Sequence, residues 1–515
     1  MMRTDDATGS QPSLMRRLSV TRLWPLAIMF VIWGFVNTQP IRPHDFWWHL
    51  QAGKEIVTAH RIPTVDTFSY TMLGKPYDNY ASFWLMELAY YLLYSSGGPA
   101  LVILFHSLLV TTAYGIITWL CREISGSWRL AAAGTFFAAA LGMNDWNVRP
   151  QAIAFPLAAL ELWAIYAYRA RPRAWLLMAF PLITMVWANS HGSFMIGLLL
   201  LAIWLAAEAW RLLIAKVKRQ PGLGLRPLAA PSIALVTSIL ASLANPRGLR
   251  IFAYVGALSG NPVIRSMVPE WAPPRLSTFG GTALLVGLLF SAIVLALSWR
   301  RLSAFQVLTF VTFAILASRT SRGIVWFGMV MAPVLADQLA ALNAGQKQPQ
   351  AKVRPQAPNM LLLNCVLIVL MLSGVVLSLP WFKHLLPLPQ TKIGLLSAET
   401  PVEATRFLLR EHPAGRLFHD QAFGSYLIWA AQPPSGYAVF VDTRIELYPP
   451  RIWKDYLDIS AAWGDWEGKL RQYGVNTLML SPEGQPALID AVRRSASWRI
   501  VYEDRSAVIL VPNTG

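Results

Sequence analysis

Long apolar runs, separated by short polar or basic connections, occupy most of the first three quarters of the sequence. A helix needs about 20 mostly apolar residues to cross a hydrocarbon core of roughly 30 Å. Runs that reach or approach this length lie at residues 23–39, 99–120, 130–144, 152–168, 174–189, 193–214, 227–244, 279–298, 303–318, 323–341 and 359–380. The pattern predicts a polytopic α-helical membrane protein with about eleven transmembrane helices.

The pattern changes after residue 380. Short alternating runs such as Tyr437–Val441, Thr477–Leu480 and Ala507–Val511 are typical of strands, and helical patterns such as Pro401–Glu411 lie between them. We therefore expect a small α/β domain over residues 381–515, after a cytoplasmic N-terminus over 1–22 and a transmembrane domain over 23–380. Residues 343–358, rich in Gln, Pro and Lys, are expected to form a cytoplasmic linker before the last span.

The distribution of charge predicts the orientation. Charged residues make up 14% of the chain, and the net charge is +17. From Lys383 onward fourteen basic residues face fourteen acidic ones, so the whole excess belongs to the membrane part. Basic loops of membrane proteins stay in the cytoplasm, and the chain has no nucleic-acid motif. Arg16, Arg17 and Arg22 before the first span therefore predict a cytoplasmic N-terminus, and an odd number of spans predicts an extracytoplasmic C-terminal domain.

The first outer loop, about residues 40–98, is far longer than the connection of two spans requires. It opens with Asp45, Trp47, Trp48 and His49. A carboxylate beside two indoles at a membrane surface could act as a general base or hold a divalent cation, and indoles can stack on sugar faces. An aromatic belt with a solvated Asp45 is the alternative. Asp66, later in the loop, is a second candidate carboxylate, or else an N-cap or turn residue.

The end of this loop, Ser82–Tyr94, is apolar but contains Glu87. Trp84, Glu87 and Tyr91 fall on one helical face, so we expect an amphipathic helix at the membrane interface.

Further polar residues recur where the later spans are expected to reach the outer surface. They are Arg149, Gln151, Asn189, His191, Arg247, Glu270, Arg319 and Arg322. Ionisable groups at such positions normally face a cavity or each other, and several arginines around one cavity favour an anionic ligand such as a phosphate. Each arginine could instead snorkel or pair with Asp145 or Glu270. His191 could donate to the phosphate or move a proton, or it could be a packing residue.

The layout of the whole chain resembles the GT-C superfamily of membrane glycosyltransferases, which includes protein O-mannosyltransferases, oligosaccharyltransferase catalytic subunits and aminoarabinose transferases. The resemblance in residues is concentrated in His44–His49, where Asp45 matches the first-loop acid of the superfamily in position. Segments 45–70, 149–151, 189–192 and 441–448 resemble poorly characterised bacterial membrane proteins usually assigned to it. Two features depart from the family pattern: Asp45 has no adjacent second carboxylate, and the C-terminal domain has no Trp-Trp-Asp motif.

The resemblance implies transfer of a sugar from a polyprenyl-phosphate donor to an acceptor on the outer side of a bacterial inner membrane. Asp45 would be the base, His191 and Asp66 further catalytic candidates, and Asp45 the ligand of Mg²⁺ or Mn²⁺ if a metal is required. A glycan ligase or a phosphoryl-group transferase would use the same arginines. A lipid or glycan transporter, or an assembly scaffold, is the non-enzymatic alternative; the crowding of polar groups on one side argues against a transporter. In the C-terminal domain, Asp442, Arg444 and Glu446 form a charged cluster that could position the acceptor or be a structural ion pair.

Overall fold

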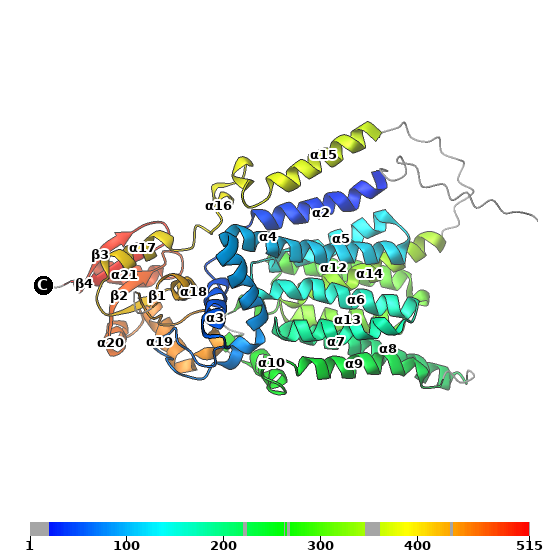
Figure 1. The fold of residues 1–515 in the computed structure, drawn as a ribbon, viewed down its shortest axis with the longest axis horizontal. Helices are drawn as coiled ribbons and strands as arrows, with labels where there is room; N and C mark the ends of the chain where they lie inside the picture. The colour runs from blue at the N-terminus through cyan, green and yellow to red at the C-terminus, as the bar shows by residue number, and fades with distance from the viewer. Residues whose placement is uncertain are drawn as a thin grey trace, which may run out of the picture.

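The computed structural model describes residues 20–219, 224–261, 263–264, 268–345, 361–432 and 436–513. Arg16, Arg17 and most of the linker predicted at 343–358 lie outside these residues. The molecule is elongated: a bundle of roughly parallel helices carries a small sheet domain at one end (Figure 1).

The bundle accounts for all eleven apolar runs. Its helices are α2 (Val20–Thr38), α4 (Trp84–Ser125), α5 (Trp128–Gly142), α6 (Ala154–Ala170), α7 (Ala174–Ala188), α8 (Met195–Val217), α9 (Arg226–Ser242), α12 (Phe279–Leu297), α13 (Ala304–Arg319), α14 (Gly323–Gly345) and α15 (Leu361–Leu377). Within the described residues, five helical segments are long and apolar enough to cross a membrane: 84–125, 150–170, 192–217, 279–297 and 323–344. A helical membrane domain is thus confirmed, whereas the number of spans and their orientation stay predictions.

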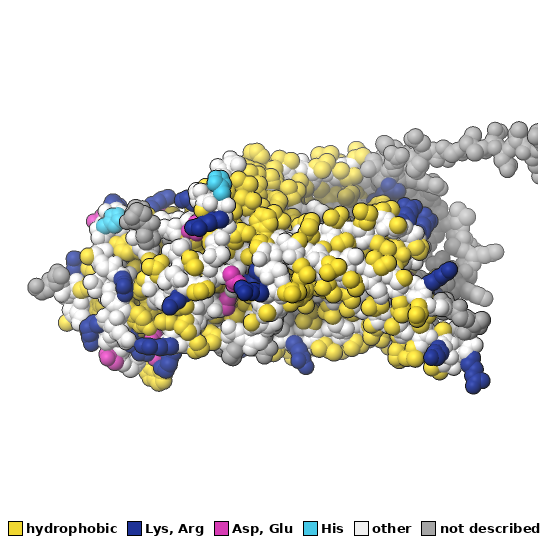
Figure 2. All heavy atoms as spheres, turned by 60° about the horizontal axis from the view of Figure 1, so that its bottom comes forward, with side chains coloured by type: hydrophobic (Ala, Val, Ile, Leu, Met, Phe, Trp, Pro, Cys, Tyr) yellow, Lys and Arg dark blue, Asp and Glu magenta, His cyan; other side chains and the backbone are white. Residues whose placement is uncertain are grey.

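The outer surface of the bundle fits a lipid environment. Figure 2 shows a broad hydrophobic band over the helices, with Lys and Arg visible at both ends of the molecule and Asp and Glu visible only toward the sheet domain. Large apolar side chains such as Val286 on α12 and Leu370 on α15 are exposed, which is costly in water and favourable in lipid.

The first loop folds against the same end of the bundle as the sheet domain. It forms α3 (Phe46–Ala59) and the 3₁₀ turn η1 (Asp78–Ser82), and then enters α4. The backbone leaves helical geometry at Gly97 and Gly98, where Gly98 has a φ of 62° that favours glycine. This kink separates the segment predicted to lie at the interface from the part of α4 within the bundle.

The C-terminal domain combines helices with a four-stranded sheet. The helices are α16 (Gln390–Ile393), α17 (Val402–Glu411), α18 (Gln421–Ala430), α19 (Pro450–Ser460), α20 (Trp466–Gln472) and α21 (Pro486–Arg494). The strands β1 (Arg416–His419), β2 (Val475–Leu480), β3 (Trp498–Glu503) and β4 (Val508–Pro512) lie in the order β1-β2-β4-β3. Strands β1 and β2 run parallel, and the other two pairs run antiparallel. This confirms the predicted small α/β fold.

One predicted strand is wrong. The run Tyr437–Val441 joins no strand of the sheet; instead Val439 pairs with the first loop, accepting from the Tyr70 amide at 3.1 Å and donating to the Phe68 carbonyl at 3.0 Å. The alternating apolar pattern that predicted a strand of the sheet thus belongs to a segment that connects the C-terminal domain to the first loop by backbone hydrogen bonds.

Candidate functional site

A charged chain of side chains lies where the bundle meets the C-terminal domain. Asp45, the N-cap residue of α3, has a side chain that is 27% exposed. One of its carboxylate oxygens, Oδ2, lies 3.5 Å from Nε of Arg149. Arg149 precedes the turn η3 (Pro150–Ile153), and its carbonyl oxygen accepts from the Tyr90 hydroxyl at 2.8 Å. The connection between α5 and α6 therefore holds this arginine beside the first-loop acid.

Glu270 joins two arginines. It lies on the short turn η5 (Pro269–Trp271), after α10 (Arg250–Gly260). Nη1 of Arg149 lies 2.8 and 2.9 Å from its two oxygens. Arg322, between α13 and α14, donates to Oε2 from Nε at 3.0 Å and from Nη2 at 2.9 Å. Asp45, Arg149, Glu270 and Arg322 thus form one chain built from four separate connections.

The two guanidinium groups change the acidity of the carboxyls around them. Burial would raise the pKa of Glu270, but Arg149 and Arg322 together lower it to about 2. Asp145, in the turn η2 (Met143–Asp145), behaves in the opposite way: burial and the neighbouring Glu270 charge raise its pKa to about 7. Glu270 is therefore charged at neutral pH, and Asp145 titrates there.

His191 precedes the turn η4 (Gly192–Phe194) near the same arginines. Burial, together with the charges of Arg322 and Arg149, lowers its pKa to about 3, so the imidazole is neutral. Its Nδ1 accepts from the Ser193 amide at 3.1 Å, which assigns the ring proton to Nε2. Burial and Arg149 also lower the pKa of His44. A neutral His191 can donate one hydrogen bond from Nε2.

The aromatic residues beside Asp45 are packed rather than exposed. Trp47 is completely buried and donates to the Arg42 carbonyl at 3.0 Å. Trp48 is 4% exposed and lies against the ring of His49, with 3.5 Å between ring centroids. His49 in turn bonds Glu87 on α4 at 2.9 Å. In this structure the three residues fix α3 on α4 and offer no open ring face for the predicted stacking on a sugar.

The remaining predicted residues divide between structural contacts and solvent. Asn189 accepts from Trp84 at 2.7 Å, and Gln151 is buried in η3. Arg247 pairs with Asp78 at 2.8 Å. Arg319 is exposed at the end of α13 and forms no ion pair with any described residue. Of the four predicted arginines, the structure thus brings Arg149 and Arg322 together. Arg247 and Arg319 do not join the row of charged side chains.

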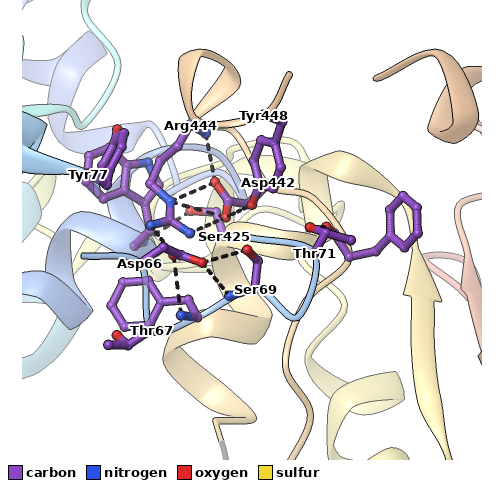
Figure 3. Close-up of polar contacts among 12 residues, drawn as sticks. Asp66, Thr67, Ser69, Thr71, Tyr77, Ser425, Asp442, Arg444 and Tyr448 are labelled. Atoms are coloured by element: carbon purple, nitrogen blue, oxygen red, sulfur yellow. Dashed lines mark hydrogen bonds and ion pairs between the residues drawn. The ribbon is translucent and has the colours of Figure 1, made fainter. Parts of the chain in front are cut away.

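The second predicted carboxylate, Asp66, is buried in a separate network (Figure 3). Its Oδ1 pairs with Nη1 of Arg444 at 2.7 Å, and its Oδ2 accepts from the Ser69 hydroxyl at 2.6 Å. Arg444 also pairs with Asp442 at 2.6 Å and donates to Tyr80 at 2.7 Å. These contacts agree with the turn and ion-pair alternatives for Asp66 and for the C-terminal cluster.

The described residues contain no group of three or more His, Cys, Asp or Glu side chains that could hold a metal ion. Asp45 already faces Arg149, so a cation there would share this carboxylate with a guanidinium. A requirement for Mg²⁺ or Mn²⁺, with Asp45 as a ligand, therefore stays a prediction.

Two hollows adjoin the site. A small pocket beside Asp45 is lined by Gln39, Pro40, Arg42, His44, Phe46, Asn147, Val148 and Arg149. An open cavity of about 730 Å³ lies between the first loop, α10 and the C-terminal domain, with Met72, Ala257, Asn261, Glu446 and Pro449 among its lining residues. Tyr254 and Val255, also on α10, approach Gly192, next to His191. Helix α10 thus lines the larger cavity and also approaches the segment that carries His191.

Comparison with solved structures identifies the fold. The crystal structure of ArnT from Cupriavidus metallidurans bound to undecaprenyl phosphate matches with a TM-score of 0.51 at 15% identity, covering 96% of this chain and 98% of that chain. The chain has the GT-C fold. The apo form of the same ArnT gives a TM-score of 0.48 at 15% identity, covering 95% and 97%. No family model and no curated protein matches the sequence.

The GT-C fold explains how polar residues so distant in sequence meet. Each pair of antiparallel helices returns the chain to the same end of the bundle, and this end carries Asp45, Arg149, His191, Glu270 and Arg322. Asp145 was visible in the sequence beside Arg149, but its raised pKa depends on burial and on the proximity of Glu270, neither of which can be predicted from sequence spacing.

Proposed function

We propose that the protein transfers a sugar from a polyprenyl-phosphate donor to an acceptor on the extracytoplasmic side of the membrane. The main support is the chain of Asp45, Arg149, Glu270 and Arg322, which puts a partly exposed carboxylate within 3.5 Å of one of two arginines that bind a single anion. The GT-C fold, shared with an ArnT that was crystallised with undecaprenyl phosphate, gives independent support for a polyprenyl-phosphate ligand.

In this mechanism the acceptor hydroxyl oxygen attacks the anomeric carbon and gives its proton to Asp45. The bond between that carbon and the phosphate oxygen breaks, and its electron pair stays on the phosphate. The leaving phosphate gains negative charge, so Arg149 and Arg322 stabilise the transition state more than the bound donor. His191 can add one hydrogen bond to the phosphate from Nε2. Attack opposite the phosphate would invert the anomeric centre.

The acceptor needs a separate path to Asp45. The cavity of about 730 Å³ beside α10 is our candidate, because the C-terminal domain forms part of its wall. The carboxylate of Glu446 accepts from the Tyr77 hydroxyl at 2.8 Å and from the Asn79 amide at 3.0 Å, which orients it in this wall. Such a carboxylate can accept hydrogen bonds from acceptor hydroxyl groups.

Lipid analysis tests the donor assignment directly. We expect mass spectrometry of lipid co-purified with the protein to detect a polyprenyl phosphate or its sugar conjugate. The Asp45→Asn variant should retain the sugar conjugate, because its donor site is intact and transfer is blocked, whereas Arg322→Ala should retain less of either lipid. Absence of these lipids from all three preparations, together with no binding of added undecaprenyl phosphate, would refute the proposal. Retention of a whole lipid-linked glycan would indicate the ligase alternative.

A further inference from the structure

The space between the guanidinium groups of Arg149 and Arg322 is filled by a side chain of the protein itself. Nη1 of Arg149 contacts both oxygens of Glu270, and Arg322 directs two donors at Oε2, all at 2.8 to 3.0 Å. Arginine donors bind carboxylate and phosphate oxygens with the same forked geometry. We propose that Glu270 occupies, in the unliganded protein, the position of the donor phosphate and turns away when the donor binds. This inference rests on the proposed function.

The charges of the two anions match. A carboxylate carries one negative charge, as does the phosphodiester of a polyprenyl-phosphate sugar. Exchange of one for the other therefore leaves the net charge beside Asp45 and Asp145 unchanged. Without a ligand, Glu270 provides a negative charge between the two arginines. It thereby reduces the repulsion between two guanidinium groups in a partly buried site, where the arginine side chains are 19% and 25% exposed.

The Glu270 side chain can leave without unfolding its turn. The backbone of η5 is fixed independently: the Arg322 amide donates to the Glu270 carbonyl at 3.1 Å, and the Ser321 amide donates to the Ala272 carbonyl at 3.0 Å. Trp271 also packs against Arg322, with 5.0 Å from the guanidinium carbon to the ring centre. The carboxylate is 30% exposed, so rotation about the side-chain bonds can carry it into solvent. The exchange needs a rotamer change only.

A resident anion would also assist turnover. Transfer converts the phosphodiester into a phosphate monoester, which carries up to two charges and binds a pair of arginines more strongly. The returning Glu270 carboxylate competes with this product for the same donors and promotes its release. This competition lowers the affinity of the protein for both donor and product. Removal of the Glu270 carboxylate should therefore make both lipids bind more tightly.

The test is binding of undecaprenyl phosphate to detergent-purified protein. Glu270→Gln keeps the size of the side chain and removes its charge, and we expect it to bind roughly tenfold more tightly than wild type, the effect of about 1.4 kcal/mol. Glu270→Ala, which cannot reach the arginines, should show the same gain. Glu399→Gln is the matched control, since it removes one charge from an exposed side chain near His44.

Three outcomes would overturn the inference. Equal or weaker binding by both Glu270 variants, at unchanged thermal stability, would mean that Glu270 orients the arginines instead. An equal gain in Glu399→Gln would assign the effect to overall charge. If wild type binds no undecaprenyl phosphate, or if Arg149→Ala and Arg322→Ala bind it as well as wild type does, the proposed function itself fails. A gain confined to the Glu270 variants, together with a loss in the arginine variants, supports both proposals.

Discussion

Arg444 and Asp66 form an ion pair of 2.7 Å in which both side chains are completely buried, although 377 residues lie between them in the sequence. Asp442 forms a second ion pair with the same guanidinium at 2.6 Å. The network ties the first loop, which carries Asp45, to the C-terminal domain. We propose that it positions α3 and has no direct part in catalysis.

Breaking this network should destabilise the protein. Removal of one partner from a buried pair typically costs about 3 to 5 kcal/mol, so Arg444→Met, which leaves Asp66 and Asp442 without a cation, should lower the free energy of unfolding by this order. Asp66→Asn should cost less, because Arg444 keeps its pair with Asp442. Thermal and denaturant unfolding in detergent measure the loss. Arg406→Met is the control, because its pair with Glu403 is exposed and should contribute at most about 1 kcal/mol. Asp66→Asn with normal stability but no turnover would favour the prediction that Asp66 is a catalytic residue.

Asp45→Asn should abolish most of the transfer while leaving the fold and donor binding intact. The amide keeps the size of the side chain but cannot take up the acceptor proton. General-base catalysis commonly contributes about 10²- to 10⁴-fold, and we expect a loss of kcat in this range with little change in KM for the donor. Release of undecaprenyl phosphate from a labelled donor is the measurement. Turnover at the wild-type rate would exclude Asp45 as the base.

The three arginines near the end of the bundle should differ in their effect on phosphate binding. Arg149→Ala and Arg322→Ala each remove hydrogen bonds to a charged group, which are worth about 1.5 to 3 kcal/mol, or roughly ten- to a hundredfold in affinity. Lysine should rescue only part of the loss because it lacks the fork. Arg319→Ala should bind undecaprenyl phosphate like wild type, since the Arg319 side chain is exposed and lies apart from Arg149 and Arg322. Equal losses of affinity in all three variants would contradict the prediction that Arg149 and Arg322 bind the phosphate and Arg319 does not.

Binding of the anionic lipid should weaken as the pH rises through about 7. Asp145 has a raised pKa of about 7, so it is neutral below this pH and adds a negative charge beside Arg149 and Arg322 above it. Folding favours the protonated carboxyl, so wild type should also lose stability relative to Asp145→Asn as the pH rises toward 7. The measurement is the affinity for undecaprenyl phosphate from pH 5.5 to 8.5. The phosphate itself titrates near pH 6, so the difference between wild type and Asp145→Asn isolates this residue. Parallel pH profiles would contradict the prediction.

Much of the fold could be predicted from the sequence. Eleven apolar runs coincide with helices because burial in lipid requires continuous apolar segments whose backbone bonds are satisfied internally. The basic loops predict an odd number of spans. Alternation of helix direction then predicts that Asp45, Arg149, His191, Glu270 and Arg322 lie at one end of the bundle, where the structure has them. In the C-terminal domain, Val402–Glu411 and Val475–Leu480 were predictable because their apolar positions repeat with helical and strand periods.

The contacts within that end depended on tertiary structure. The sequence treated Arg149, Arg247, Arg319 and Arg322 alike, because each follows or precedes an apolar run. Packing decided that Arg149 and Arg322 bind one carboxylate, that Arg247 pairs with Asp78, and that Arg319 faces outward. Such selection requires angles and distances between helices, which hydrophobic periodicity does not encode.

Trp47, Trp48 and Asp66 illustrate the same division. Their places in the sequence predict that these residues lie in the first loop, at the membrane surface, where indoles and carboxylates are common. Tertiary structure decided that α3 turns both tryptophans into the core and that Arg444 closes over Asp66. A buried ring or ion pair needs partners from distant segments, here α4 and the C-terminal domain, and these segments come together only when the chain folds.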